Sequence, residues 1–170
     1  MSENNFLDSI SCPKDLKALD EKELKLLAEE IRQRLITTVT QTGGHLSSNL
    51  GLVELTIALH RVFKSPYDHI LWDVGHQCYT HKLLTGRCGE FDSLRCKGGI
   101  SGYPFPCESE HDFFHTGHSG TAVSSALGIA RAKNIKRDNT FVIAVVGDGS
   151  FTNGLVYEAL NNAGRSNSRL

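Results

Sequence analysis

The spacing of apolar residues in the first quarter of the chain predicts a long amphipathic helix. Between Asp20 and Gly43, leucine, isoleucine and valine recur every three or four residues, which is the period of a helix with one buried face. Asp20 followed by Glu23 is typical of a capping box and predicts that the helix begins there. The paired glycines Gly43 and Gly44 predict its end. The positions that carry this period are Leu24, Leu27, Ile31, Leu35 and Val39.

Shorter elements follow this helix. After the polar loop Gly43–Asn49, a second helix is expected to end near Ser65, because the next residue is proline and disfavours helix before it. The segment Ile70–Asp73 predicts a short strand, and a Gly-containing turn after it leads into a helix that holds His81. The second helix is expected to turn four apolar residues inward: Leu52, Leu55, Leu59 and Val62.

The middle of the chain predicts a long loop and a packing helix. Residues 95–106 are rich in glycine and proline, and a loop of this length in a compact domain is usually functional or mobile. The helix expected after Gly120 is rich in small residues, which allow close approach to a sheet or to another helix. These small residues are Ala122, Ser125, Ala126, Gly128 and Ala130.

The strongest local signal is the run Phe141–Val146, in which six apolar residues follow one another without alternation. Such a run is typical of a strand buried on both faces, as in a parallel sheet. A Gly-Asp-Gly turn follows it, and residues 152–163 then predict a helix. The resulting fold class is α/β, with a parallel sheet flanked by helices, where ligands bind at the carboxyl ends of the strands.

The Gly147-Asp148-Gly149 turn predicts a metal-bridged diphosphate site. Glycine lets the backbone lie close to a ligand, and a helix N-terminus suits a phosphate. A carboxylate beside a phosphate requires a cation between them, and Mg²⁺ takes hard oxygen ligands from protein and substrate together. The alternative is that Asp-Gly forms a hairpin turn, which would need an alternating strand after Phe151. Residues 151–164 do not alternate, so this alternative is weaker.

Three glycine-flanked polar turns also place a histidine at the end of a predicted element. They contain His45, His76 and His118, and each precedes a predicted helix. Histidine is suited to proton transfer near neutral pH and, when charged, to phosphate binding. A single loop histidine is most often only a surface residue. Three in matching contexts, together with Asp148, predict one functional site.

Composition excludes several classes of protein. The 170 residues are 39% hydrophobic and 22% charged with a net charge of -1, which is ordinary for a globular domain and predicts no attraction to nucleic acid or membrane. The N-terminus lacks the basic start and apolar core of a secretion signal. Five cysteines, an odd number without a C-x-x-C pair, favour reduced thiols and a cytoplasmic protein. Zinc is the alternative, but the cysteine and histidine spacings match no zinc pattern.

Five short motifs occur in an order and spacing typical of one family. They are Asp73–Gln77, Gly98–Gly102, Glu108–Glu110, Gly117–Ser119 and Gly147–Gly149. From about Leu7 to Leu170 the chain resembles the N-terminal part of 1-deoxy-D-xylulose-5-phosphate synthases, thiamine-diphosphate enzymes related to transketolase. The resemblance implies a thiamine-diphosphate-binding fold. Residues 1–170 would be the N-terminal part of the diphosphate-binding domain, truncated before the sheet is complete, with the other domains absent.

The resemblance also implies a transferase and its cofactors, thiamine diphosphate and Mg²⁺. The family condenses pyruvate with glyceraldehyde 3-phosphate, releases CO₂, works as a homodimer and feeds isoprenoid, thiamine and pyridoxal synthesis. Carried over by motif, Asp148 is the metal ligand and His45 is a catalytic histidine that assists proton transfer. The cofactor-binding residues implied in this way are His76, Gly117, His118, Ser119, Gly149 and Ser150.

The chain departs from the family pattern at its end. The family's second metal ligand is an asparagine about thirty residues after the aspartate, and Asn161, Asn162 and Asn167 come too early. The glutamate that activates the cofactor is also absent. We therefore expect residues 1–170 alone to be inactive and to bind thiamine diphosphate weakly. We also expect them to be poorly soluble, because the strand that begins at residues 168–170 is never completed and a hydrophobic edge of the sheet stays exposed. Two alternatives remain. The first is a non-catalytic remnant or partner module, and the second is a half-subunit of a split transketolase. The loop from Gly98 to Glu110 argues against the second alternative, because it resembles the synthase pattern.

Overall fold

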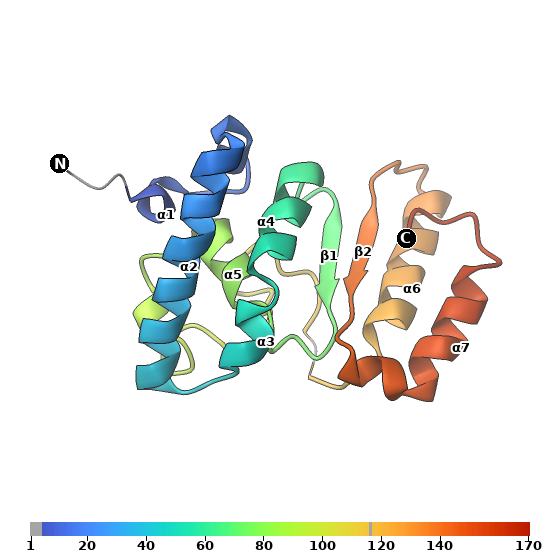
Figure 1. Cartoon of the computed structure of the whole chain (residues 1–170). Coiled ribbons are helices and arrows are strands. Elements are labelled where there is room, and N and C mark those ends of the chain that lie inside the picture. The colour runs from blue at the N-terminus through green and yellow to red at the C-terminus, as the bar shows by residue number, and fades with distance from the viewer. Residues whose placement is uncertain (1–4, 116) are drawn as a thin grey trace. The chain divides into compact units, whose positions relative to one another are not determined.

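The protein, described by a computed structural model over residues 5–115 and 117–170, divides into two compact units (Figure 1). The first unit comprises the chain up to Lys64 together with His76–Gly102. The second unit comprises Ser65–Gly75 together with Tyr103–Leu170. Each unit is therefore built from two stretches that are separated in sequence. Within the described residues, none of the helices is long and apolar enough to cross a membrane.

The first unit is helical, and α2 (Glu21–Thr42) is its longest element. Asp20 accepts hydrogen bonds from the Lys22 and Glu23 amides, while the Glu23 side chain accepts one from the Asp20 amide. The predicted capping box is thus confirmed, and α2 ends at Gly43 as expected. The other elements are α1 (Phe6–Ser9), η1 (Asp15–Ala18), α3 (Leu46–Leu50), α4 (Val53–Val62), α5 (Tyr79–Lys82), η2 (Leu83–Arg87) and η3 (Phe91–Ser93).

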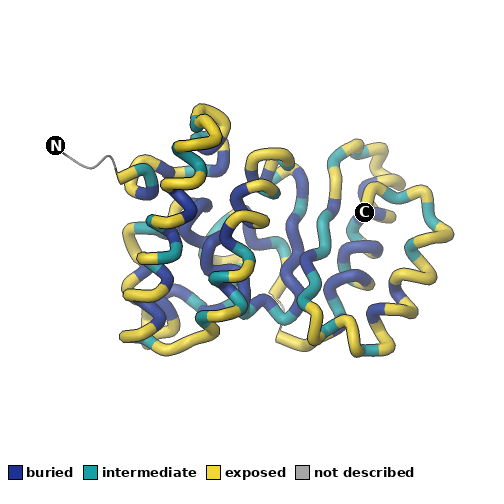
Figure 2. Tube along the Cα trace, viewed as in Figure 1, coloured by how far each residue is buried: buried dark blue, intermediate teal, exposed yellow. Residues whose placement is uncertain are grey.

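The core of the first unit forms against one face of α2. Elements α1, α3, α4, α5 and η3 all contact this helix, and Figure 2 shows buried and exposed positions alternating along it. Burying a leucine, isoleucine or valine side chain contributes about 1.5–3 kcal/mol, so the buried positions of α2 stabilise its packing with the other helices. The predicted stripe is confirmed at Leu27, Ile31, Leu35 and Val39.

The predicted inward face of α4 is wrong. Leu55 is 46% exposed and Val62 is 70% exposed. The buried face instead contains two polar side chains with hydrogen-bond partners: the Thr56 hydroxyl donates to the Leu52 carbonyl at 2.7 Å, and Nε2 of His60 bonds to the His81 ring at 2.8 Å. Hydrophobicity alone misplaced this face because the polar groups find partners inside the unit. The buried residues of α4 are Val53, Thr56, Ile57 and His60.

The second unit contains a parallel pair of strands, β1 (His69–Trp72) and β2 (Val142–Val145). The register pairs His69 with Val142 and Trp72 with Val145. Helix α6 (Ala122–Ile135) lies in the connection between the strands, as a parallel pair requires, and α7 (Gly154–Ala163) packs on α6 (Figure 1). The predicted α/β class, with a parallel sheet and flanking helices, is confirmed.

The small residues of α6 pack as predicted. Ala126 and Ala130 are buried against Leu71 of β1 and Val142 of β2, and together they form the core of the sheet–helix layer. A second cluster joins Val123 to α7. A larger side chain at these alanines would push the helix away from the strands. This packing fixes where α6 begins relative to the carboxyl end of β1.

Two details of β2 and of the helix after it differ from expectation. Strand β2 is not buried on both faces throughout, because Ile143 and Ala144 are half-buried. The predicted helix over residues 152–163 begins only at Gly154, after a short 3₁₀ turn, η4 (Gly149–Thr152). The structure assigns no strand to the described residues 168–170, but the Val142 amide donates to the Arg169 carbonyl at 2.9 Å. This single hydrogen bond adds no strand to the sheet, so the prediction that the sheet is incomplete is confirmed over the described residues.

Candidate functional site

In the first unit, the structure brings together two predicted site residues, His45 and His76. Their ring centroids lie 4.9 Å apart, and the planes meet at 65° in an edge-to-face arrangement. His45 is exposed at the start of α3, and His76 is half-buried in the turn before α5. Thirty-one positions separate them in the sequence, so this contact is a product of the fold. An exposed imidazole beside a second imidazole is able to exchange protons with a ligand.

A residue that the sequence analysis missed, Asn49, joins these two histidines. Its side chain is fully buried, and its Nδ2 donates to the carbonyl of His45 at 2.6 Å and to the carbonyl of His76 at 2.9 Å. Its Oδ1 accepts a hydrogen bond from the Tyr79 amide at 2.9 Å. The sequence signal was present, since Asn49 is a polar residue in the first turn after His45. Nothing in sequence shows which distant backbone such a side chain binds.

Tyr79 supports the loop before His45. Its side chain is fully buried, and a Cβ placed on Gly44 would lie 2.8 Å from the Tyr79 hydroxyl oxygen. Gly44 has a φ of +142°, so both its conformation and this contact favour glycine. Burial raises the pKa of the Tyr79 hydroxyl, while the nearby His45 backbone and Arg95 side chain oppose that rise without completing a well-formed hydrogen bond. The phenol is therefore neutral at physiological pH.

In the second unit, Asp73 at the carboxyl end of β1 holds the turn that contains His118. Asp73 is 1% exposed, and its carboxylate accepts hydrogen bonds from the Gly120 amide at 2.9 Å and the Ala122 amide at 3.0 Å. A carboxylate at the start of α6 also interacts favourably with the helix dipole. Asp73 was noticed only as part of a motif. The sequence pattern that indicated Asp148, an aspartate just after a predicted strand, is also present at Asp73.

The predicted cofactor residues Gly117, His118 and Ser119 lie exposed between Phe114 and Gly120. Asn153, which the sequence analysis did not single out, connects them to the other predicted turn. Its Nδ2 donates to the Ser119 carbonyl at 3.3 Å, and its Oδ1 caps α7 by accepting from the Leu155 amide at 3.0 Å. An asparagine before a helix is a common N-cap, which could have been read from the sequence.

The turn after β2 carries the remaining predicted residues. Asp148 and Gly149 are exposed, and Ser150 is half-buried at the start of η4. A Cβ added at Gly147 or Gly149 would meet no atom within 4 Å, so this turn is open to a ligand. Because β1 and β2 are parallel and in register, Asp73 and Asp148 follow their strands at the same edge of the sheet. This edge is where ligands bind in open α/β sheets.

The chemistry of Asp148 suits Mg²⁺ only if other ligands supply most of the coordination. Its carboxylate is a hard oxygen donor in an open turn, which fits a magnesium ion bridging to a diphosphate. Over residues 5–115 and 117–170, no three His, Cys, Asp or Glu side chains are grouped so that they could hold a metal ion by themselves. Asp148 would supply one carboxylate oxygen to such an ion, and the cofactor and water would supply further oxygen ligands.

The predicted site residues thus fall into two groups. His45 and His76 lie together in the first unit, whereas the His118 and Asp148 turns belong to the second unit. In the second unit, Asn153 bonds to the Ser119 turn and follows η4 directly. That both groups face one cleft stays a prediction.

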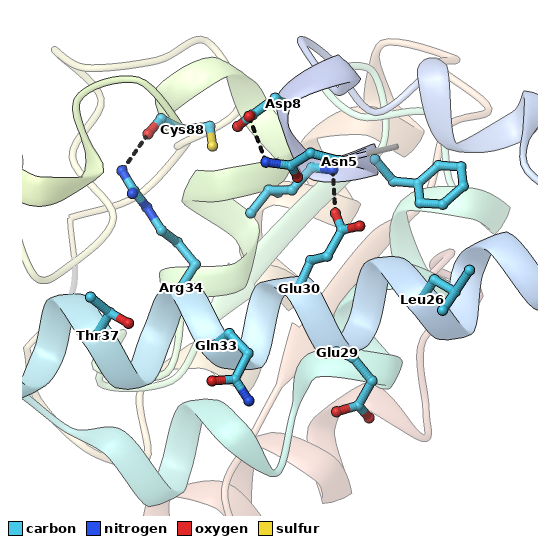
Figure 3. Close-up of a pocket in the computed structure, with 11 residues that line it drawn as sticks. Asn5, Asp8, Leu26, Glu29, Glu30, Gln33, Arg34, Thr37 and Cys88 are labelled. Atoms are coloured by element: carbon cyan, nitrogen blue, oxygen red, sulfur yellow. Dashed lines mark hydrogen bonds between the residues drawn. The ribbon is translucent and has the colours of Figure 1, made fainter. Parts of the chain in front are cut away.

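A large open groove of about 1110 Å³ lies elsewhere in the first unit, along α1 and α2 (Figure 3). Its polar groups largely satisfy one another. The Glu30 carboxylate accepts from the Leu7 amide at 2.7 Å, and Arg34 donates to the Cys88 carbonyl at 3.4 Å. Burial raises the pKa of the Cys88 thiol, so this cysteine is a poor nucleophile. The groove contains none of the residues predicted to form the site.

Comparison with known proteins gives one consistent result. The family model described as 1-deoxy-D-xylulose-5-phosphate synthase matches residues 7–170. The chain is 57% identical over 165 residues to 1-deoxy-D-xylulose-5-phosphate synthase 1 of Geobacter metallireducens, covering 97% of this chain and 26% of that protein. It is 59% identical over 161 residues to the synthase of Caldanaerobacter subterraneus subsp. tengcongensis, covering 95% and 26%. The chain therefore spans about a quarter of the length of these curated relatives.

Proposed function

Because the chain belongs to the 1-deoxy-D-xylulose-5-phosphate synthase family, we propose that it serves as the N-terminal segment of such a synthase. The enzyme would condense pyruvate with glyceraldehyde 3-phosphate and release CO₂, using thiamine diphosphate and Mg²⁺. The observation that carries the proposal is the family match over residues 7–170, which contains every motif singled out in the sequence. A homodimer in the cytoplasm is the proposed setting, and the five free cysteines are consistent with a reducing compartment.

The second unit is proposed to hold the diphosphate end of the cofactor. Asp148 would ligate Mg²⁺, while Gly149, Ser150 and the Gly117–Ser119 turn would lie beside the phosphates. Support comes from the exposed, open Gly147–Gly149 turn and from the location of both turns at the carboxyl edge of β1 and β2. The bound cofactor would supply the carbanion chemistry. The protein's task in this unit is to bind and orient.

The first unit is proposed to supply the proton-transfer group. His45 is exposed, and its ring lies 4.9 Å from the ring of His76. An imidazole ring carries both a hydrogen-bond donor and an acceptor nitrogen, so His45 is suited to give or accept a proton near the reacting carbon atoms. His76 would contact the cofactor and limit the orientations that the His45 ring can adopt.

Calorimetric titration tests the binding part of this proposal. The 170-residue chain is titrated with thiamine diphosphate in the presence of Mg²⁺, with Asp148→Asn as the test variant and exposed Asp92→Asn as the matched control. We expect weak binding that Asp148→Asn abolishes and Asp92→Asn preserves. Equal binding by Asp148→Asn would exclude Asp148 as the metal ligand. Micromolar binding by the unmodified chain would contradict the prediction that its site is incomplete.

Turnover is tested in a chimera in which the chain replaces the matching segment of the Geobacter metallireducens synthase. We expect CO₂ release from pyruvate that depends on glyceraldehyde 3-phosphate, and none from the 170-residue chain alone. In the chimera, His45→Ala should lower kcat far more than it weakens cofactor binding. Cofactor binding without turnover in a folded chimera would instead favour the alternative, a non-catalytic binding module.

A further inference from the structure

Asn49 makes more long-range backbone contacts than its position in a five-residue helix would suggest. The helix is α3 (Leu46–Leu50), and Asn49 is its second-to-last residue. One amide group binds three backbone groups, which are 4, 27 and 30 residues away in sequence. With no solvent exposure, the side chain has no water to replace any of these partners. Each bond therefore depends on the position of the other two.

The geometry of the amide links the backbones of His45 and His76 directly. The two hydrogens of an amide NH₂ group lie in one plane and point in fixed directions. Here the Nδ2 group donates one to each histidine carbonyl, at 2.6 and 2.9 Å. The separation of the two carbonyls is thereby set by a single nitrogen atom. The rings carried by these two backbones meet edge to face, with 4.9 Å between their centroids.

The loop before His45 needs such a restraint. Gly43 and Gly44 have φ values of +77° and +142°, and glycine gives the backbone wide freedom at both positions. The Tyr79 side chain lies against Gly44, and the Tyr79 amide is the group that Asn49 Oδ1 binds. Asn49 therefore also positions Tyr79, whose side chain packs against this loop. Without this restraint, the two glycines would let the backbone of His45 adopt many positions.

We propose that Asn49 is a positioning residue, which holds the His45 ring against His76 through their backbone carbonyls. The consequence for catalysis rests on the function proposed above: proton transfer by His45 depends on Asn49, although Asn49 touches neither substrate nor cofactor. Asparagine is specific for this role. An aspartate would direct an oxygen at two carbonyl oxygens, and a serine is too short to reach both.

The first test measures the geometry without any assay of activity. The 170-residue chain is labelled with ¹³C in its histidine rings, and the nuclear Overhauser effect between the His45 and His76 ring protons is recorded. The test variant is Asn49→Ser. The matched control is Thr56→Val, which replaces the hydroxyl of another fully buried side chain with a methyl group; in the described part of the chain this hydroxyl donates to the Leu52 carbonyl.

We expect the signal between the two rings to persist in Thr56→Val and to disappear in Asn49→Ser. Circular dichroism establishes first that each variant is folded. If Asn49→Ser does not fold, Asn49→Gln takes its place, since it keeps the amide but shifts it by one methylene. An unchanged ring-to-ring signal in a folded Asn49 variant would overturn the proposal.

The second test separates positioning from general stability by a double-mutant cycle in the chimeric synthase. Small misplacements of a catalytic group cost up to about 100-fold in rate, so we expect Asn49→Ser to lower kcat by about 10- to 100-fold. In the His45→Ala background the same substitution should have little further effect. An equal loss in both backgrounds would show that Asn49 acts independently of His45. If His45→Ala leaves kcat unchanged, the proposed role of His45 fails, while the ring-to-ring signal still decides the role of Asn49.

Discussion

Replacing Asp73 with alanine should be among the most damaging single changes in the second unit. The carboxylate is 1% exposed and accepts hydrogen bonds from the Gly120 and Ala122 amides. These two bonds are the link from the carboxyl end of β1 to the start of α6. Alanine removes the acceptor and leaves two amide groups without it in a site that water cannot easily enter.

The magnitude follows from the two bonds and the charge. Hydrogen bonds to a charged group contribute about 1.5–3 kcal/mol each. A negative charge at a helix N-terminus adds roughly 0.3–1 kcal/mol. We therefore expect Asp73→Ala to lower the free energy of unfolding by about 3–7 kcal/mol and Tm by roughly 6–28 °C. Asp73→Asn keeps one acceptor oxygen and should lose about half as much.

Urea denaturation provides the stability, and amide hydrogen exchange provides the location. The control is Asp92→Ala, which removes an exposed carboxylate paired with Arg34 at 3.2 Å and should cost less than about 1 kcal/mol. In Asp73→Ala, exchange at Gly120 and Ala122 should accelerate before exchange in the middle of α6. The reasoning is refuted if Asp73→Ala is no more destabilising than Asp92→Ala, or if exchange at Gly120 and Ala122 does not change.

Three further substitutions, at Gly120, His69 and Asp138, test other parts of the structure. Gly120→Ala should lower the free energy of unfolding by at least about 1 kcal/mol, because Gly120 has a φ of +84° and the new Cβ would lie 2.7 Å from Asn153. The control is Gly128→Ala on the exposed side of α6, which should instead raise the free energy of unfolding by about 0.5–1 kcal/mol. Chemical denaturation measures both changes. Burial lowers the pKa of His69 from 6.5 to about 4, so the folded state favours the neutral ring. The neutral ring therefore contributes to stability above pH 6.5, and this contribution is lost as the pH falls toward 4. His69→Gln should flatten the stability profile over that range, and a profile as steep as that of the unmodified protein would contradict this. Asp138→Asn should remove a further loss of stability between about pH 4 and 2, because hydrogen bonds from Thr140, with help from Lys133, hold the Asp138 pKa at about 2.

Sequence determined the local elements of this protein because their signals are local. The capping box at Asp20, the stripe from Leu27 to Val39 and the apolar run around β2 each depend on residues that are neighbours in the chain. The α/β class followed from the same signals, since an unalternating strand with a helical crossover predicts a parallel sheet. The family resemblance, confirmed over residues 7–170, supplied the site residues that periodicity could not.

The errors arose where burial depends on distant partners. The inner face of α4 was misplaced because His60 is buried by its bond to His81, which lies in another helix. The Val142 amide of β2 likewise donates to the Arg169 carbonyl, although residues 168–170 form no strand. Both contacts join residues more than twenty positions apart, and no pattern within a short window contains them.

Tertiary structure alone identified the residues that hold the candidate site in place. Sequence indicated histidines and aspartates after glycine-rich turns, because glycine and polar residues at element ends are visible in one dimension. Asn49, Asp73 and Asn153 act through hydrogen bonds to backbone groups 27–49 residues away. Backbone amides and carbonyls are the same in every residue, so a sequence carries no mark of which one a side chain will bind. Only the folded chain decides these pairings, and they determine where the chemically active side chains lie.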